Sequence, residues 1–332
     1  MFKYKDSFDA AALDFLLADN EHIEPRYADI EPLPASIFTE KNITVSVLRL
    51  DRYLPQLSGN KYFKLKYNLR HIVEAGFTTV ISFGGAYSNH LHALAFACQC
   101  LNIQLIAVIR GERPAKLSAT LQDIEAMGGH LTFVTRQSYR QRHTFDYQAE
   151  LIAQYDNAYC LPEGGSNVLA LQGSREIVTH IRNHIGSQFD TVLVACGTGA
   201  TAAGIAAELK ARQRVLAISV LKSALGLHED IQRLLLAAQI QPQADWQILH
   251  DYAGAGYGKC DKPLAEFIRW LKDNTGIETE PVYTGKLFSA LFAMAKADVF
   301  KPGERLVVIH SGGMQGLRGM QARLDALLET QS

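Results

Sequence analysis

The segment at 191–201, Thr-Val-Leu-Val-Ala-Cys-Gly-Thr-Gly-Ala-Thr, combines a strand, a glycine turn and the start of a helix. Its first five residues have the composition of a buried strand, and residues 202–209 are the small and apolar residues of a packed helix. From Phe77 onward, similar apolar runs recur, each followed by ten to eighteen helix-like residues. This alternation predicts an α/β fold with parallel sheets.

Two open, twisted and mostly parallel sheets with helices on both faces are expected. The smaller one has strands expected at 79–83, 104–109, 130–134 and 159–161, and helices beginning near Ser88, Ser118 and Tyr139. The larger one has strands expected at 191–195, 215–220, 247–252 and 305–310 and helices at 168–185, 201–210, 227–238, 263–274, 287–297 and 317–328. An alternating strand pattern also covers residues 43–50.

Composition favours small-molecule partners. The 332 residues carry 33 basic and 34 acidic side chains, well interspersed, so no charged stripe suits nucleic acid or a membrane surface. An odd number of cysteines, five, fits a reducing cytoplasm. Charged residues interrupt the first twenty positions, and polar residues break the longest uncharged runs, so neither a secretory nor a transmembrane segment is expected.

The turn Ser58-Gly59-Asn60-Lys61 precedes a helix-like run at 62–74. A lysine that is desolvated, or that lies near other cations, can form a Schiff base with an aldehyde or a carbonyl. Lys64 and Lys66 follow closely and are expected to lower the pKa of Lys61. The alternative interpretation is an ordinary helix start with solvated lysines.

A glycine-rich turn at 84–90, Gly-Gly-Ala-Tyr-Ser-Asn-His, places Ser88 and Asn89 at a helix N-terminus, where anions bind. The alternative is a simple N-cap serine. His90 and His92 do not predict a metal site, because helix residues two apart do not face one site and no further ligands accompany them. The turn Gly-Gly-Ser-Asn at 164–167 is either a second site turn or a connection with a helix cap.

The turn after residue 195 predicts a phosphate site, because glycines let an anion approach the free amides at a helix start. Gly197, Gly199 and Ala202 also satisfy the dinucleotide pattern G-x-G-x-x-A. That pattern requires an acidic residue at the end of the next strand, where this chain has Leu-Lys-Ser at 221–223. A single phosphate is therefore the simpler ligand.

Two further turns, Glu-Pro-Val-Tyr-Thr-Gly-Lys at 280–286 and Ile-His-Ser-Gly-Gly at 309–313, close the carboxyl-terminal sheet and could face the same cleft. Tyr257 lies among small residues at 253–258, and Tyr283 is a second candidate. Core or interface packing is the alternative role for both tyrosines.

These motifs together resemble the 1-aminocyclopropane-1-carboxylate deaminase and D-cysteine desulfhydrase family of pyridoxal phosphate enzymes. Ser-Gly-Asn-Lys at 58–61, Gly-Gly-x-x-Ser-Asn-His at 84–90, the phosphate turn and Pro-Val-Tyr-Thr-Gly-Lys at 281–286 occur in family order. The resemblance implies the tryptophan-synthase-β-like fold, pyridoxal phosphate fold type II. It also implies a large cofactor-binding domain from 1–63 and 164–332, a small α/β domain at 64–163, and the cofactor pyridoxal 5'-phosphate in the interdomain cleft.

The resemblance also implies roles for single residues. Lys61 would be the Schiff-base lysine, Asn89 the partner of the pyridoxal 3-oxygen, and Ser88 a contact of the substrate carboxylate or a proton-transfer group. Tyr257 and Tyr283 would line the substrate side. The phosphate would be held by Gly197, Thr198, Gly199, Ala200 and Thr201, and Thr284 would meet the pyridine nitrogen.

The chain departs from the family pattern at Tyr87, at Leu91-His92 and at Phe63, and these changes bear on the substrate rather than on the cofactor. The deaminases of the family carry Glu at the position of Thr284, whereas the desulfhydrases carry Thr. The expected activity is therefore β-elimination from D-cysteine, giving pyruvate, ammonia and sulfide, by a cytoplasmic homodimer. The alternatives are a cyclopropane deaminase giving 2-oxobutyrate and ammonia, an NAD(P)-dependent oxidoreductase, or a non-catalytic binding module.

Overall fold

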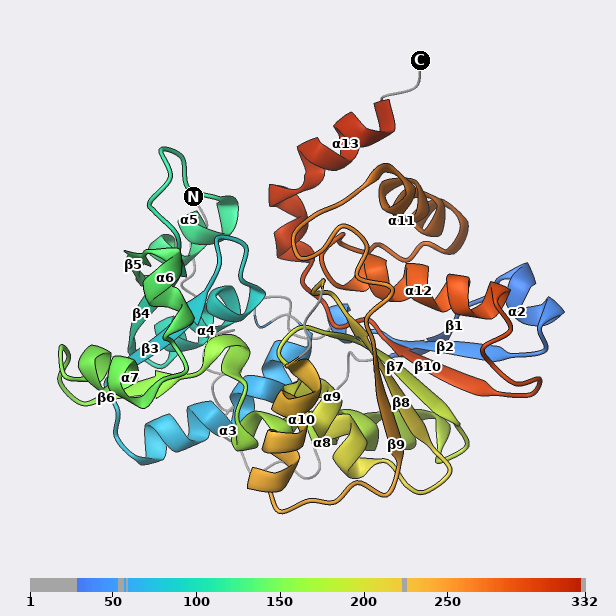
Figure 1. Cartoon of the computed structure of the whole chain (residues 1–332), viewed down its shortest axis with the longest axis horizontal. Helices are drawn as coiled ribbons and strands as arrows, with labels where there is room; N and C mark the ends of the chain where they lie inside the picture. Colours follow the sequence, from blue (N-terminus) through green and yellow to red (C-terminus); the bar gives the residue numbers. More distant parts are fainter. Residues whose placement is uncertain (1–28, 53–56, 58, 223–225, 330–332) are drawn as a thin grey trace.

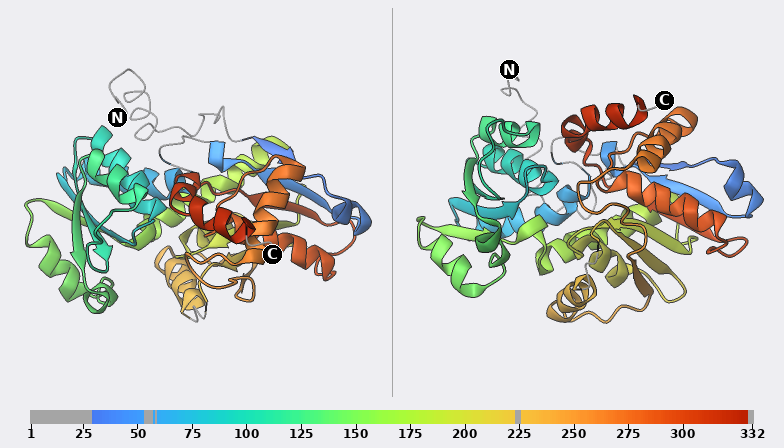
Figure 2. Two further views of the ribbon diagram at one scale, coloured as in Figure 1. Left: turned by 90° about the horizontal axis from the view of Figure 1, so that it is seen from above. Right: turned by 45° about the horizontal axis from the view of Figure 1, so that its top comes forward.

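Two separate β-sheets organise the computed structural model, which describes residues 29–52, 57, 59–222 and 226–329 (Figure 1). Ser58 of the lysine turn lies outside the described residues. In the views of Figure 2, as in Figure 1, the smaller sheet and its helices form one lobe and the larger sheet forms the other. Within the described part of the chain, no helix has the length and apolarity needed to cross a bilayer.

The larger sheet has six strands in the order β1-β2-β10-β7-β8-β9. Only the edge pair β1 and β2 is antiparallel. Segments far apart in the sequence meet here, because β2 pairs with β10 near the end of the chain. The strands are β1 Ile30–Pro32, β2 Thr44–Leu48, β7 Thr191–Cys196, β8 Arg214–Ser219, β9 Asp245–Leu249 and β10 Arg305–Ile309.

The smaller sheet has four parallel strands in the order β5-β4-β3-β6. Its central strands are almost wholly buried, as expected for a parallel sheet covered on both faces. The strands are β3 Thr79–Gly84, β4 Gln104–Arg110, β5 His130–Val134 and β6 Ala158–Leu161.

The α-helices of the described residues alternate with these strands. They are α2 Ser36–Glu40, α3 Asn60–Glu74, α4 Asn89–Cys100, α5 Ala119–Ala126, α6 Arg136–Arg140, α7 Phe145–Ile152, α8 Val168–Ile185, α9 Ala200–Glu208, α10 Leu227–Ala237, α11 Lys262–Thr275, α12 Thr284–Lys296 and α13 Gln321–Glu329. Short 3₁₀ turns lie at Leu50–Arg52 (η1), Glu163–Gly165 (η2) and Met314–Gly319 (η3).

The predicted elements are confirmed to within two residues at each end, with four corrections, the first of which is that the helix expected at 287–297 begins at Thr284. The strand expected at 247–252 is Asp245–Leu249, because the pairing of β9 with β8 ends at the pair Ile218 and Leu249. The helix expected to begin near Tyr139 begins at Arg136, capped by Thr135, and a second helix follows at Phe145. The helix expected at 317–328 is preceded by η3, which follows Gly313 in a left-handed conformation (φ 88°).

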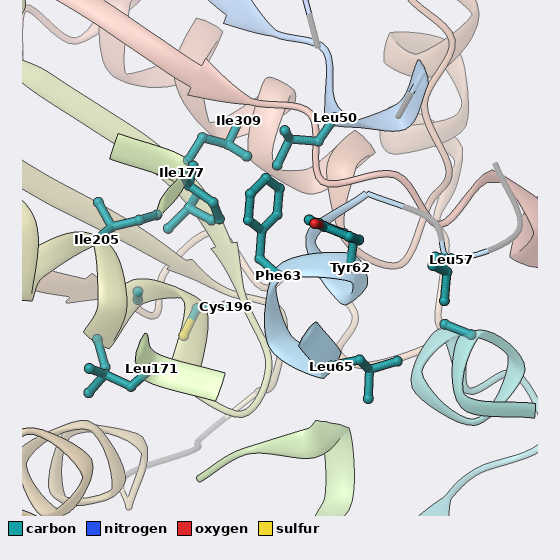
Figure 3. Close-up of a cluster of buried hydrophobic side chains, with 14 of the residues drawn as sticks. Leu50, Leu57, Tyr62, Phe63, Leu65, Leu171, Ile177, Cys196, Ile205 and Ile309 are labelled. Carbon is teal, nitrogen blue, oxygen red and sulfur yellow. The ribbon is translucent and has the colours of Figure 1, made fainter. Parts of the chain in front are cut away.

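The hydrophobic core holds α3 in place between the two sheets. One cluster of buried side chains extends from β2, β7 and β10 through α3, α8 and α9 to β3, β4 and α4. Phe63 on α3 extends toward Leu50, Ile309 and Ile177 (Figure 3). A second cluster covers the other face of the larger sheet beneath α2, α11 and α12. The position of α3 is therefore fixed by contacts with both lobes.

Close approach of α3 and α8 depends on Gly173. A Cβ atom at this position would lie 1.9 Å from the carbonyl oxygen of Phe63. The backbone of α3 cannot yield to that contact without moving the helix. Glycine is therefore required in the interior of α8 although it is a poor helix former.

We expect Gly173→Ala to lower the free energy of unfolding. Overpacking costs roughly 1–3 kcal/mol, which exceeds the roughly 1 kcal/mol that alanine gains over glycine in a helix. Urea unfolding followed by circular dichroism measures the difference. Gly85→Ala is the control, because a Cβ atom there would have no neighbour within 4 Å. Equal stability of the two variants would contradict the close contact.

Candidate active site

A cavity of about 690 Å³ lies between the two lobes, at the carboxyl ends of strands from both sheets. Ligands of open α/β sheets bind at this edge. All of the residues proposed from sequence line the cavity except Ala200 and Thr284, which are fully buried. Those that line it are Lys61, Ser88, Asn89, Gly197, Thr198, Gly199, Thr201, Tyr257 and Tyr283.

The lysine turn docks on the turn that follows β10. The amide of Asn60 donates to the carbonyl oxygen of Ser311 at 3.2 Å. Gly59 has φ 63°, and a Cβ atom there would lie 2.1 Å from the same oxygen. A glycine is therefore required both by the left-handed backbone and by the close approach.

Lys61 presents an amine whose pKa is lowered. Its Nζ donates to Asn60 Oδ1 at 2.8 Å, and Asn60 Nδ2 donates to Thr201 Oγ1 at 3.0 Å. Burial lowers the pKa of Lys61 to about 8, and attraction to the Glu280 carboxylate opposes this decrease. The neutral, nucleophilic form of the amine is therefore far more populated near neutral pH than for a solvated lysine.

Lys64 and Lys66 have different surroundings. Lys64 Nζ donates to Thr198 Oγ1 at 3.1 Å, and burial together with the charge of Lys61 lowers the pKa of Lys64 to about 7. Lys66 instead pairs with Glu176 at 2.9 Å, so the expectation that it acts on Lys61 is wrong. Lys64 is a phosphate-binding candidate that sequence reasoning missed. The spacing of three from Lys61, which puts both on one helix face, could have indicated it.

The phosphate turn has the geometry of an anion site. Gly199 is the N-cap residue of α9 with φ 86°, so free backbone amides lie at the cavity wall. The turn at 164–167 supports it, because Ser166 Oγ donates to the carbonyl oxygen of Thr198 at 2.9 Å. Burial raises the pKa of Cys196 to about 12, so this neighbouring thiol is neutral.

The N-terminus of α4 forms the opposite wall. Ser88 is the N-cap residue, and its Oγ accepts from the amide of Leu91 at 3.2 Å. Asn89 Oδ1 accepts from Gln315 Nε2 at 3.2 Å, so a residue of η3 orients the amide of Asn89. Gln315 was not identified from sequence, because its 3₁₀ turn has no periodic pattern. Ser88 therefore caps the helix and also faces the cavity.

The two histidines on α4 have separate partners. His90 Nε2 lies 2.8 Å from Ser82 Oγ, which donates its proton to the carbonyl oxygen of Leu161 at 2.9 Å. His90 Nε2 must therefore be the donor in its own hydrogen bond. His92 lies against Asp123 at 3.1 Å instead. The two imidazoles do not converge.

The positions that depart from the family pattern lie outside the cavity lining. Leu91 is in the core, and His92 pairs with Asp123, which also contacts Arg318 of η3. Tyr87 packs close to Gly319 at the end of η3. Tyr87 and His92 lie at the contact between η3 and the small-sheet lobe, and their bearing on the substrate stays a prediction.

Two tyrosines cover the phosphate turn. Tyr283 Oη donates to Tyr257 Oη at 3.2 Å, and the rings meet edge to face with centroids 5.9 Å apart. A Cβ atom at Gly197 would lie 3.2 Å from the ring of Tyr283. Burial raises the pKa of both phenols, so both are neutral. They form a hydroxyl pair on the cavity wall.

Thr284 belongs to a buried network around Glu280. The Glu280 carboxylate accepts from the amides of Val282, Tyr283 and Thr284 at 2.6, 2.8 and 2.7 Å. Thr284 Oγ1 also donates to it at 3.1 Å. Burial raises the pKa of Glu280, and these donors oppose the increase. The sequence analysis singled out Thr284 but did not identify the Glu280 carboxylate that accepts its hydrogen bond.

Fold and cavity together define an α/β enzyme that binds a phosphorylated ligand beside a buried lysine. The chain belongs to the family of pyridoxal-phosphate dependent enzymes, whose family model matches residues 32–312. The cofactor of this family is pyridoxal phosphate, so the dinucleotide alternative is set aside.

Curated relatives and a solved structure agree with this membership. A putative 1-aminocyclopropane-1-carboxylate deaminase of Pyrococcus horikoshii is 27% identical over 94% of this chain and 98% of its own length. A bifunctional D-cysteine desulfhydrase/1-aminocyclopropane-1-carboxylate deaminase of Arabidopsis thaliana is 30% identical over 82% of this chain and 73% of its own length. The crystal structure of an ACC deaminase homologue matches with a TM-score of 0.79 and 28% identity, covering 95% of this chain and 98% of that chain.

The residues present fit pyridoxal phosphate. The cavity brings together an amine for the aldehyde, free amides and Lys64 for the phosphate, and neutral hydroxyls on the remaining wall. Glycine is also required at position 199, since the backbone is left-handed there and a Cβ atom would meet the side chain of Ile231 on α10 at 2.8 Å.

We expect Gly199→Val to weaken binding of pyridoxal phosphate by roughly tenfold or more, because the left-handed backbone and the contact with Ile231 would displace the turn that carries the free amides. Equilibrium dialysis with the visible absorption of bound cofactor measures the affinity. Gly303→Val is the matched control: its φ of 84° is similar, but no atom lies within 4 Å of its Cβ position. Equal affinities in the two variants would refute the placement of the phosphate.

Proposed function

We propose that this enzyme is a pyridoxal phosphate-dependent lyase that catalyses β-elimination from D-cysteine or a related β-substituted amino acid. The observation that carries the proposal is the hydrogen-bond chain from Lys61 through Asn60 to Thr201, which couples a reactive amine to an anion site. The bifunctional Arabidopsis relative and a D-cysteine desulfhydrase of Klebsiella pneumoniae, 24% identical over 79% of this chain, support the reaction class.

Each part of the cavity has a role in this proposal. Pyridoxal phosphate, when bound, supplies an aldehyde that joins amines and a ring that accepts negative charge from Cα. Lys61 anchors the aldehyde and then, as a neutral amine, takes the α-proton at Nζ. The turn at 197–201 and Lys64 hold the phosphate. Asn89 orients the ring through the 3-oxygen, and Ser88 holds the substrate carboxylate at the N-terminus of α4.

The hydroxyl pair Tyr257–Tyr283 lines the side on which the leaving group departs. A neutral phenol can donate to a departing hydrosulfide and limit the access of water. The products would be pyruvate, ammonia and sulfide.

Thr284 favours elimination over ring opening. A carboxylate beside the ring nitrogen stabilises the protonated ring, which is the stronger electron sink that an unactivated cyclopropane requires. In this chain the Thr284 hydroxyl donates to the Glu280 carboxylate and accepts from the Glu280 amide, so it has at most one neutral lone pair to offer, which stabilises a protonated ring less than a carboxylate does. The alternative, a 1-aminocyclopropane-1-carboxylate deaminase, is supported by the descriptions of the Pyrococcus relatives.

We also propose a cytoplasmic homodimer divided into a large domain of residues 1–63 and 164–332 and a small domain of residues 64–163. Membership of β1, β2 and β7–β10 in one sheet and of β3–β6 in the other supports the division. Five cysteines that form no disulfide with one another support a reducing compartment. Sedimentation analysis tests the dimer.

We expect Lys61→Ala to abolish both turnover and the borohydride-stable link to the cofactor, because Lys64, the other lysine that lines the cavity, is held at the phosphate turn by Thr198. Lys66→Ala should retain both, since its side chain pairs with Glu176. Borohydride reduction followed by peptide mapping identifies the modified lysine. Trapping at Lys64 in the Lys61→Ala variant would reassign the nucleophile.

Substrate choice can be measured directly. We expect the purified enzyme to release sulfide and pyruvate from D-cysteine and to form scarcely any 2-oxobutyrate from 1-aminocyclopropane-1-carboxylate. Thr284→Glu should raise the second activity relative to the first, because it adds the carboxylate. Robust 2-oxobutyrate formation by the unchanged enzyme, with no sulfide, would overturn the argument from Thr284.

A further inference from the structure

The cavity continues well beyond the residues assigned to cofactor and substrate. Its lining follows α10 from Leu227 to Ala237, which is about 15 Å at the α-helical rise. On the facing lobe it includes Arg110 at the end of β4 and Arg142 in the connection between α6 and α7. We call this region the outer cavity. A three-carbon amino acid does not need a wall of this length.

Most charges of the outer cavity are already paired. Arg142 Nε donates to Glu163 at 2.7 Å, and its guanidinium lies 4.7 Å from the ring centroid of Tyr139. On α10, Arg233 pairs with Asp230 at 3.2 Å. Burial lowers the pKa of His143, so this imidazole is neutral at physiological pH. The charges of the two ion pairs cancel, so none of these groups offers an unpaired charge to a ligand.

Arg110 is different. It is exposed, lines the cavity, and has no hydrogen bond or ion pair with any residue that the structure describes. Ile109 pairs with Gly84, so Arg110 lies beside the glycine turn that leads to Ser88. Across the cavity, burial raises the pKa of Tyr257 and the charge of Arg110 opposes the increase, so the two side chains influence each other. An unpaired guanidinium thus faces the space between the α-carboxylate site and the outer cavity.

A guanidinium binds carboxylate, sulfonate or phosphate through two parallel hydrogen bonds. The α-carboxylate already has a place at the N-terminus of α4. We infer that Arg110 binds a second anionic group, on the substrate side chain, and that the preferred substrate is a β-substituted amino acid whose leaving group already carries a negative charge while it is attached to Cβ. This inference rests on the proposed function and specifies its substrate class.

The chemistry balances without a further reactant. For O-phospho-D-serine, the α-proton is removed, the Cβ–O bond breaks with its electron pair on phosphate, and one water converts the remaining fragment to pyruvate and ammonium. β-Chloro-D-alanine gives the same two products with chloride as the leaving group. The two substrates share the α-carboxylate and differ in the charge on the side chain.

The experiment compares these two substrates in the holoenzyme by pyruvate release. We expect Arg110→Gln to lower kcat/KM for O-phospho-D-serine by roughly 10- to 100-fold, mainly through KM, because charge-assisted hydrogen bonds are lost. The value for β-chloro-D-alanine should change less than about threefold. Arg110→Lys should restore part of the loss. The visible spectrum of the bound cofactor should be the same in each variant.

Arg113→Gln is the matched control, because Arg113 is exposed, pairs with Glu125 at 2.9 Å and does not line the cavity. Equal losses for both substrates in Arg110→Gln would show that Arg110 binds the shared α-carboxylate and would overturn the inference. No loss for either would also overturn it. If the unchanged holoenzyme binds cofactor but eliminates from neither substrate nor from D-cysteine, the proposed function fails and the inference fails with it.

Discussion

The side-chain amide of Asn60 joins the lysine turn to the phosphate turn, with Nδ2 donating to Thr201 and Oδ1 accepting from Lys61. The two turns lie 140 residues apart in the chain (201 − 61), so only the tertiary fold brings them together. Asn60 is itself held by Ser311, at the end of β10. Asn60 thus holds three turns from three places in the sequence relative to one another. The distance between the Lys61 amine and the anion site is therefore set by the contacts of this one residue. Such preorganisation is what a covalently bound, phosphorylated cofactor requires.

Burial of two lysines in one cavity destabilises the cofactor-free protein, and a bound phosphate would reduce this destabilisation. Burial lowers the pKa of Lys61 to about 8 and that of Lys64 to about 7, both below the usual 10.5. Between these values and 10.5 the unfolded chain binds more protons than the folded one, so the stability of the cofactor-free protein rises with pH across this window. In the proposed function, a phosphate dianion beside Lys64 would favour its ammonium form and oppose the effect of burial. For Lys61, attraction to the Glu280 carboxylate opposes burial only in part, so the amine stays available as a nucleophile and base.

Sequence patterns predicted the strands and most helices because buried parallel strands are short apolar runs and their glycine turns interrupt them visibly. The same turns predicted the cavity wall, from Lys61 to Tyr283. Side-chain directions were not predictable in this way. Whether Lys64 or Lys66 enters the cavity depends on how α3 rotates against α8, and that rotation is set by the contact of Gly173 with Phe63. The pairing of Thr284 with Glu280 depends on a buried turn without a periodic pattern. The residue roles and the domain boundaries stay predictions.

Two of the positions that differ from the family pattern, Tyr87 and His92, lie where η3 meets the small-sheet lobe. His92 and Arg318 share Asp123, and Gln315 orients Asn89 from the same segment. This contact therefore orients Asn89 in the cavity wall. Chemistry at Cα needs only the part of the cavity around Lys61 and the phosphate turn. Different reactions of the same class can use that part unchanged. Under the inference drawn for Arg110, discrimination among β-substituted substrates acts farther out, where α10 faces β4 and where the guanidinium of Arg110 has no protein partner among the described residues.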